Sequence, residues 1–529
     1  MDDTRVALES ETTLGGPPSQ CPPICKLLVM CLVFASISFS MWALGVGWNN
    51  SIFDAHGFRQ AQTAISVYYT KWGSEFLSYE TPVLGPPWSI PFEFPMFQSI
   101  VALVWRLLPL QLDQAGRLTA VAFFYATFPP LFILLRAVRI DVTTILVTVA
   151  LLAVSPQYIF WSRTFMIEST ALCLAVTYLM FVVLALNHIA YRGSTFWVLG
   201  TFSAIAGVLA GMVKITTFVP FFLGASLLMS YSFWKRWGEL RHRLSIVSFL
   251  PLCALLMPVF CVAKWTAYAD SLKNGNPLSG ILTSHMLRGW NFGTFQQRIA
   301  FGNYVHFAGI GIGSVLDDLA GSRYLLLLSC VIALAMGGYT LRFVAVCVTL
   351  YMSAIAIFFN LYFVHTYYSY ANGIFIIAVV GIASGSLLNA GGWRSWAGVC
   401  VFVLAIGFST VHYLHGYYRV QRANAPGRPV LADILDRETK PTDVLLIYGL
   451  DWSAELPYQA HRRAIMIREA QRNANLQQAI REEGVNNISN LLICDENLKA
   501  SADVLTVLRE YGVKFGRVFA SNGCDIYLR

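Results

Sequence analysis

The chain has 529 residues, of which 56% are hydrophobic and only 12% are charged, and its mean hydropathy is +0.57. Soluble domains are typically about 45–50% apolar and about 25% charged, so this composition excludes a soluble enzyme, a disordered chain and a disulfide-stapled secreted module. Charge is unevenly placed: 29 of the 115 residues from His415 to Arg529 are charged, but only 37 of the 414 before them. The sequence therefore predicts a membrane body followed by a soluble C-terminal domain.

The formal net charge of +8 arises almost entirely in the membrane part. No basic run exceeds two residues, so we attribute the excess to membrane topology and anion handling, and expect no nucleic-acid partner. The C-terminal part contains two cysteines, Cys494 and Cys524. A disulfide between them would fit a domain on an oxidising face of the membrane.

Eleven apolar segments are long enough to cross a membrane. They lie at 26–46, 117–136, 142–160, 169–188, 195–213, 215–232, 245–264, 322–338, 342–361, 371–388 and 395–414. A further segment, 92–110, is interrupted by charged residues and prolines, and the basic residues at span ends alternate consistently only if it does not cross. We expect it to lie at the outer interface. The predicted fold is a polytopic α-helical membrane protein with about 11 spans, within a range of 11–13.

This topology divides the chain into three parts. Residues 1–25 form a cytoplasmic tail, and residues 26–414 form the transmembrane body with long outer loops at 47–116 and 265–321. Residues 415–529 alternate extended apolar runs with helical stretches, which predicts a soluble α/β domain on the outer face. This domain lacks a Gly-rich phosphate loop, so we expect it to act as a lid or to dock the acceptor. The loops with unusual chemistry all fall on the outer face.

The first outer loop places Asp54, His56 and Arg59 within six residues, followed by Gln60, directly after a membrane span. Burying charge near hydrocarbon is costly unless the charges are paired or used. One interpretation is a helix start with a surface ion pair, and the other is a general base beside an anion site. Glu93 follows later in the same loop, in a stiff segment rich in proline and aromatic residues.

Other outer turns add charged groups. Arg163 and Glu168 share one turn, where a snorkelling arginine and a helix-start glutamate are the alternatives to a functional pair. Lys214 stands alone between two apolar runs and either snorkels or binds a phosphate. An interfacial aromatic belt would explain Tyr367, but it does not explain the neighbouring His365.

These groups suit a transfer reaction. A carboxylate that takes a proton from a hydroxyl, facing cations that hold a leaving phosphate, is the arrangement that a transferase needs. Inverting displacement at a sugar carbon needs only one base. A donor carried on a membrane lipid would explain why the site lies at the outer surface of a helical bundle.

Three segments resemble the C-type (GT-C) glycosyltransferase superfamily, which includes protein O-mannosyltransferases and the lipid A aminoarabinose transferase. These segments are Asp54–Thr63, Glu93–Gln98 and Ser162–Glu168. The resemblance implies that Asp54 is the base that activates the acceptor and Glu168 the second acidic position. It also implies a polyprenyl-phosphate sugar donor, whose phosphate would be held by residues from four turns: Arg59, Arg163, Lys214 and His365.

The acceptor would be a glycan, a lipid or a protein. The resemblance favours a bacterial inner membrane with the active site facing the periplasm, and an endoplasmic reticulum membrane is the alternative. Ala55 follows Asp54 where protein mannosyltransferases have an adjacent Asp-Glu pair. The sequence therefore requires no metal, although it leaves a divalent cation open as a cofactor. The alternatives are a transporter or flippase of an anionic lipid-linked substrate, and a non-catalytic component that binds lipid-linked glycans. The lack of an internal repeat and the clustering of charge on one face favour the transferase.

Overall fold

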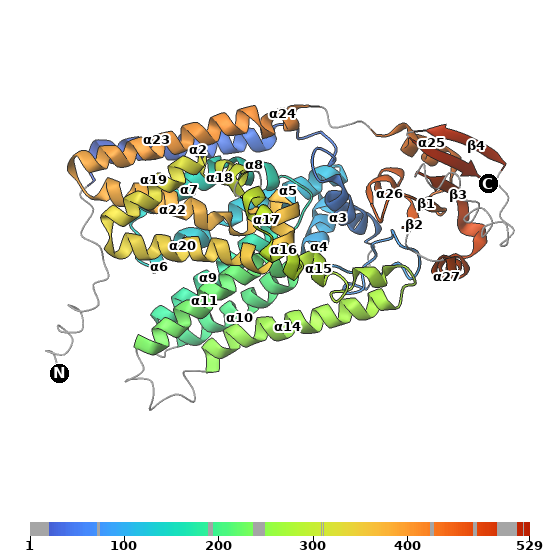
Figure 1. Cartoon of the computed structure of the whole chain (residues 1–529), viewed down its shortest axis with the longest axis horizontal. Coiled ribbons are helices and arrows are strands. Elements are labelled where there is room, and N and C mark those ends of the chain that lie inside the picture. Colours follow the sequence, from blue (N-terminus) through green and yellow to red (C-terminus); the bar gives the residue numbers. More distant parts are fainter. Residues whose placement is uncertain are drawn as a thin grey trace.

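The computed structural model describes residues 21–70, 75–188, 194–235, 249–307, 309, 312–423, 428–468, 473–494, 516–521 and 523–529. A bundle of long helices carries a small sheet-containing domain at one end, which we call the domain end (Figure 1). The cytoplasmic tail is expected over residues 1–25, of which residues 1–20 lie outside the described part of the chain. The first helix begins at Pro23, within the range expected for the tail.

Nine helical segments in the described part of the chain are long and apolar enough to cross a membrane, so the protein is an integral membrane protein. These segments are α2 (Pro23–Gly45), α5 with α6 (Leu112–Ala126 and Phe128–Ala137), α9 (Glu168–Asn187), α10 (Ser194–Val213), α11 (Ile215–Lys235), α14 (Phe249–Asn274), α20 (Gly338–Ile357), α22 (Ser369–Asn389, extended back to Thr366 by the 3-10 turn η4) and α23 (Gly392–His415). A tenth candidate is the pair α18 (Ile312–Ala320) and α19 (Arg323–Met336), bent by 73°. The polytopic helical fold is thus confirmed.

Several expected boundaries differ. The span expected at 142–160 is two helices, α7 (Val142–Val154) and α8 (Pro156–Trp161), because Pro156 has no N–H to continue the first helix and is suited to begin the second. The segment 92–110 contains only the 12-residue helix α4 (Met96–Leu107). At 1.5 Å per residue this helix is about 18 Å long, too short to cross a hydrocarbon core of about 30 Å.

The two long loops are shorter at one end than expected. Helix α14 continues to Asn274, so the loop expected at 265–321 starts later, and α5 begins at Leu112, which shortens the loop expected at 47–116. The described part of the later loop holds four short helical segments before α18: η2 (Ser279–Leu282), α15 (Arg288–Phe292), α16 (Phe295–Ile299) and α17 (Phe301–His306). A further short helix, α21 (Phe359–Val364), follows α20.

The C-terminal domain has an α/β fold, as expected. Its five-stranded sheet has the order β2-β1-β3-β5-β4; β1 pairs in parallel with β2 and β3, and β5 is antiparallel to β3 and β4. Cys494 and Cys524 form a disulfide. The sequence predicts helical stretches in this domain at about 429–439, 469–483 and 497–511, and the last of these lies outside the described residues. The elements are α24 (Tyr417–Arg422), α25 (Val430–Glu438), β1 (Val444–Tyr448), α26 (Glu455–Ala460), β2 (Arg463–Ile467), α27 (Asn473–Glu483), η5 (Val485–Asn487), β3 (Ile488–Ile493), β4 (Arg517–Ser521) and β5 (Cys524–Leu528).

The first loop extends this sheet. The amides of Ala464 and Met466 donate to the carbonyls of Pro82 and Val83, both at 3.0 Å, so residues 82–85 run antiparallel to the edge strand β2. Val83 is fully buried in the same hydrophobic core as the sheet. Because an unpaired sheet edge is thereby covered, the first loop and the C-terminal domain form one packed unit.

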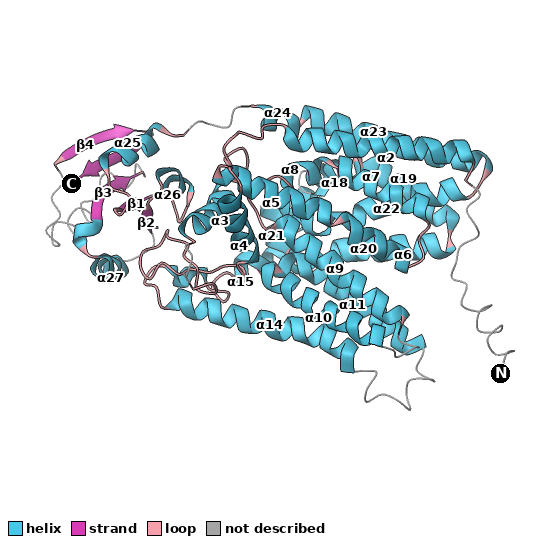
Figure 2. Cartoon of the chain, turned by 180° about the vertical axis from the view of Figure 1, so that it is seen from behind, coloured by secondary structure: helices cyan, strands magenta, loops and turns pink. Residues whose placement is uncertain are grey.

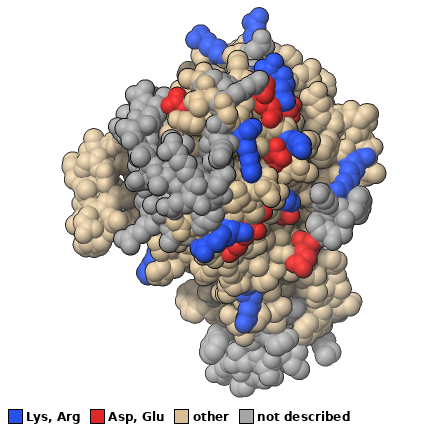
Figure 3. All heavy atoms as spheres, turned by 90° about the vertical axis from the view of Figure 1, so that its right-hand side faces the viewer, with Lys and Arg blue, Asp and Glu red and all other residues tan. Residues whose placement is uncertain are grey.

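Helix α3 (Gly57–Tyr69) and helix α4 lie between the bundle and the sheet (Figure 2). Viewed from the domain end, the surface shows Lys and Arg side chains interspersed with Asp and Glu (Figure 3). This charged end contrasts with the apolar flanks of the bundle, and it is the end at which the candidate site lies.

Candidate functional site

Asp54 lies in the loop between α2 and α3, buried against two arginines. Arg163 Nη1, from the turn between α8 and α9, is 2.7 Å from Asp54 Oδ2, and Arg117 Nη2, from α5, is 3.9 Å away. The Asp54 side chain is only 2% exposed. A carboxylate in such surroundings is stable only when it is paired, so the two arginines neutralise it.

The same arginines shape the loop that follows α2. Arg117 donates to the carbonyls of Trp48 and Ser51, each at 2.8 Å, and Arg163 donates to the carbonyl of Gly47 at 3.0 Å. The Nε atoms of both arginines are buried without a hydrogen-bond partner among the described residues. The sequence reading missed Arg117. The feature that could have revealed it is a charged residue in an apolar span, because such a residue is usually functional or paired.

Gln60 connects the first loop to the turn between α8 and α9. Its Nε2 donates to the Ala55 carbonyl at 2.7 Å and approaches Asp54 Oδ1 at 3.4 Å, while its Oε1 accepts from the amide of Phe165 at 2.8 Å. Gln60 is fully buried. Its side chain therefore holds two loops in register in this structure, rather than facing a substrate.

A second ion pair joins Glu168, the first residue of α9, to Lys214, which stands between α10 and α11. Both side chains are at most 9% exposed. Lys214 Nζ also lies 4.8 Å from the centre of the Tyr368 ring and 5.5 Å from that of Tyr367. Glu168 Oε2 is buried and has no hydrogen-bond partner among the described residues, so the pair retains an unused acceptor.

Two histidines and aromatic rings lie between these ion pairs. The ring centre of His56 is 5.2 Å from that of His365, 5.0 Å from that of Tyr367 and 5.3 Å from that of Trp161. Burial lowers the pKa of His56, although the Glu168 carboxylate opposes this effect. Burial, with the nearby His56 and Lys214, lowers the pKa of His365 to about 4. His365 is therefore neutral near pH 7 and would meet a phosphate as a hydrogen-bond donor, not as a cation.

A third ion pair is the most accessible. Arg59 Nη2 pairs with Glu93 Oε1, and Arg59 Nη1 donates to Gln62 Oε1 at 2.7 Å. The Arg59 and Glu93 side chains are 19% and 16% exposed. Among the residues expected to bind the donor phosphate, Arg59 is therefore the one that a substrate reaches with the least rearrangement.

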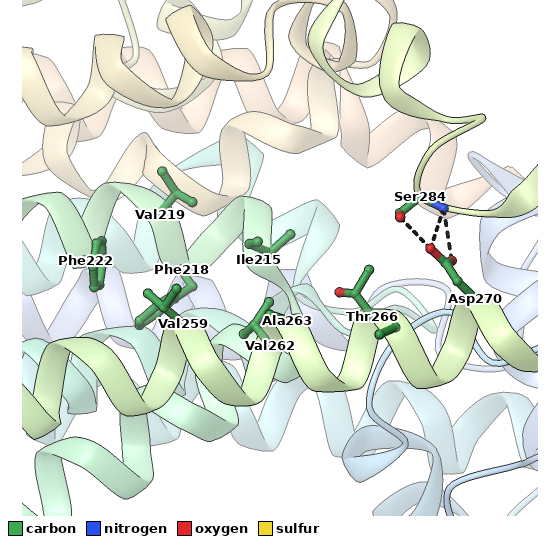
Figure 4. Close-up of a pocket in the computed structure, with 11 residues that line it drawn as sticks. Ile215, Phe218, Val219, Phe222, Val259, Val262, Ala263, Thr266, Asp270 and Ser284 are labelled. Atoms are coloured by element: carbon green, nitrogen blue, oxygen red, sulfur yellow. Dashed lines mark hydrogen bonds between the residues drawn. The ribbon is translucent and has the colours of Figure 1, made fainter.

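An apolar groove includes Ile215, the residue after Lys214, in its lining. It lies between α11 and α14 and has a volume of about 630 Å³, and Ile215 lies part-way along it, between Phe222 and Thr266 (Figure 4). Phe218, Phe222 and Val259 are among its apolar walls. Its polar end is formed by Asp270, whose carboxylate accepts hydrogen bonds from the amide and hydroxyl of Ser284.

Comparison with known proteins identifies the fold of this chain. No protein-family model matches the sequence, and no match is found among curated protein sequences. Among solved structures, ArnT from Cupriavidus metallidurans bound to undecaprenyl phosphate matches with a TM-score of 0.54 and 13% identity, over 94% of this chain and 97% of ArnT. The chain has the GT-C fold.

A second GT-C structure agrees. The archaeal oligosaccharyltransferase AglB from Archaeoglobus fulgidus, in complex with an inhibitory peptide and a dolichol-phosphate, matches with a TM-score of 0.51 and 11% identity. That match covers 94% of this chain and 74% of AglB. The likeness therefore extends through the membrane body and into the C-terminal domain.

Within this GT-C fold, the residues singled out from the sequence meet at the domain end. They form three ion pairs, whose acidic members are Asp54, Glu168 and Glu93. The His56 ring packs against the rings of His365 and Tyr367. No group of three His, Cys, Asp or Glu side chains within the described ranges is placed to hold a metal ion.

Proposed function

We propose that this protein transfers a sugar from a polyprenyl-phosphate-linked donor to a hydroxyl acceptor. The observation that carries the proposal is the apolar groove of about 630 Å³, which is lined in part by Ile215, the residue after the buried Lys214. A lipid-linked phosphate combines a long apolar chain with an anion, and the groove and Lys214 offer one surface for each. Undecaprenyl phosphate bound to ArnT and dolichol-phosphate bound to AglB support this choice of donor.

In this proposal the donor phosphate lies among Lys214, Arg59 and the neutral His365, with Arg163 behind them. The acceptor oxygen attacks the anomeric carbon, and the bond from that carbon to the phosphate oxygen breaks, leaving its electron pair on the phosphate. The hydroxyl proton passes to the Asp54 carboxylate, which is paired with Arg163 and lies near Arg117. A single displacement inverts the anomeric carbon. General-base help of this kind is worth about 10²–10⁴-fold.

Glu168 takes the second acidic role. It pairs with Lys214 before the donor arrives, which prevents an unpaired buried cation. When a phosphate approaches, Lys214 exchanges a carboxylate partner for a phosphate partner. The paired state is therefore a resting arrangement that keeps the phosphate site formed without a ligand.

The site is proposed to face the periplasm from a bacterial inner membrane. Disulfides persist on oxidising faces, so the Cys494–Cys524 disulfide supports such a face for the C-terminal domain of residues 415–529. The N-terminal tail of residues 1–25 is then cytoplasmic. A glycan, a lipid and a protein are all acceptors compatible with this placement.

Transport of a lipid-linked anion is the second candidate function. It is favoured by the 73° bend between α18 and α19, because transporters use broken helices. Transporters place their ionisable groups near the membrane midplane, however, whereas the three ion pairs here lie in the loops and helix ends of the domain end. This placement supports transfer over transport.

The test uses the purified full chain in nanodiscs with labelled undecaprenyl-phosphate sugars and octyl glycosides as acceptors. Wild-type protein should form a labelled glycoside, and Asp54→Asn should reduce its rate by about 10²-fold or more. Asp433→Asn, on the exposed surface of α25, is the matched control. Absence of any covalent product with wild-type protein would overturn the proposed function, and full activity of Asp54→Asn would remove Asp54 as the base.

A further inference from the structure

The C-terminal domain brings a carboxylate to the edge of the site. Glu455 is the first residue of α26, and it lies against Gly57, the first residue of α3. A Cβ added to Gly57 would lie 2.5 Å from Glu455 Oε1 and 2.8 Å from Phe53 Cδ1. The carboxylate therefore rests on a bare Cα, one residue after His56.

Glu455 differs from the three acids already described. Asp54, Glu93 and Glu168 each have an arginine or lysine partner, but no cation or hydrogen-bond donor in the described part of the chain pairs with the Glu455 carboxylate. Its side chain is partly buried, and this burial raises its pKa. Burial of an unpaired carboxylate is unfavourable, and hydrogen-bond donors of a ligand would offset this cost.

Helix α3 offers only part of an explanation. It has no acidic residue in its first turn and no capping side chain, and a nearby carboxylate would favour its positive N-terminal end. Yet no backbone N–H in the described chain donates to Glu455. The carboxylate therefore retains its full capacity to accept hydrogen bonds.

Packing fixes Glu455 in this position. Trp452 lies three residues earlier. Its ring centre is 4.6 Å from that of Phe58, which it meets edge-on, and 5.4 Å from that of Phe92, on which it stacks. Tyr458 lies one turn later in α26, and its ring centre is 6.3 Å from that of Phe53. Contacts on both sides of Glu455 thus hold it on a rigid element, as a binding group requires.

We infer that Glu455 binds the acceptor, and that this acceptor is a saccharide. Its carboxylate accepts hydrogen bonds from sugar hydroxyls at the junction of α26 with the start of α3, beside His56. The inference rests on the proposed function and gives the C-terminal domain a direct part in it. The lipid donor enters by the groove between α11 and α14, and the acceptor enters at the domain junction. Gly57 is required because a side chain there would displace the carboxylate.

The first test compares Glu455→Gln with Glu482→Gln, which alters an exposed glutamate of α27. Octyl β-glucoside is the acceptor probe, and undecaprenyl-phosphate sugar is the donor. Glu455→Gln should raise the KM for the acceptor about tenfold or more, because hydrogen bonds to a charged group are the strong ones. The KM for the donor should stay within about twofold of wild type. Equal acceptor KM values for the two variants would overturn the inference while leaving the proposed function intact, whereas an inactive wild type would overturn both.

The second test removes the space instead of the charge. Gly57→Ala should raise the acceptor KM as Glu455→Gln does, while Gly45→Ala should not, since a Cβ at Gly45 meets no atom within 4 Å. The double variant Gly57→Ala with Glu455→Gln should show no further loss, because both changes remove one interaction. Fully additive effects would contradict the inference.

A third measurement does not depend on turnover. The thiol introduced by Glu455→Cys is labelled with a maleimide, and the labelled peptide is quantified by mass spectrometry. Octyl β-glucoside should slow labelling several-fold, and undecaprenyl phosphate alone should not. Protection by undecaprenyl phosphate and not by the glycoside would assign Glu455 to the donor and overturn the inference.

Discussion

Arg163 Nη1 lies 2.7 Å from Asp54 Oδ2, although 109 residues separate them in the chain. Both side chains are buried, at 0% and 2% exposure. The pair joins the loop after the first span to the turn before α9, and the second arginine, Arg117, ties the same loop through its carbonyls. The candidate base is thus placed by the ion pair that neutralises it.

The pair predicts a large loss of stability when one partner is removed. Arg163→Ala should lower the free energy of unfolding by about 3–5 kcal/mol, because it leaves Asp54 buried with a single cation 3.9 Å away. Denaturation of the purified protein with SDS would measure this change. Arg428→Ala, which removes two surface ion pairs, should cost at most about 1 kcal/mol. Similar losses for both variants would contradict the account of the Asp54 cluster.

The second ion pair predicts opposite effects for its two members. Lys214→Gln should weaken the binding of undecaprenyl phosphate about tenfold, since it removes a cation from the phosphate site. Glu168→Gln should leave that affinity unchanged or raise it, because Lys214 loses its competing carboxylate partner. Isothermal titration in nanodiscs would measure both affinities, with Lys264→Gln on the exposed face of α14 as control. Equal weakening by both substitutions would show that the pair acts only as a structural unit.

The histidine pair predicts a dependence of stability on pH. The pKa of His365 is about 4 in the fold, against an ordinary value of 6.5, so the folded chain holds this ring neutral. The unfolded chain therefore binds a proton here before the folded chain does, and stability should fall as pH drops from about 6.5 towards about 4. His365→Gln should flatten this part of the curve, and His285→Gln, at an exposed position, should not. An unchanged slope in His365→Gln would refute the assignment.

Removal of the disulfide should lower the stability of the C-terminal domain. Cys494 and Cys524 are 30 residues apart, and closing a loop of this length stabilises a fold by roughly 3–4 kcal/mol in the chain-entropy estimate. Cys494→Ser should therefore lower the melting temperature of the C-terminal domain, and reductant should do the same to wild type but not to the variant. A thermal melt followed by fluorescence, with and without dithiothreitol, measures this. Identical melts of wild type under both conditions would argue against the disulfide and an oxidising face.

Much of the site could be predicted because membrane topology limits where charges fall. Once the apolar spans and their basic ends were assigned, Asp54, Arg163, Glu168 and Lys214 all fell in loops on one side, and the structure brings them together there. Their pairing was not predictable. Which cation meets which acid depends on the rotation and tilt of helices, and no local pattern in the sequence encodes these.

Three features were missed, one because of its local sequence and two because they join distant segments. Arg117 lies inside the span formed by α5 and α6, where apolar neighbours hid its role. The pairing of residues 82–85 with β2 and the contact of Glu455 with Gly57 join segments about 380–400 residues apart in sequence. Such contacts arise only when the C-terminal domain docks on the first loop. The α/β pattern of the domain was visible in the sequence, but its docking site was not.

Covalent transfer is the central claim, and proteoliposomes test it most directly. They would carry the purified chain, a labelled undecaprenyl-phosphate sugar in the membrane and octyl β-glucoside in solution. The account predicts a labelled glycoside that forms with wild-type protein and falls about 10²-fold or more with Asp54→Asn. Movement of labelled lipid between leaflets without any labelled glycoside would contradict it and identify a transporter instead.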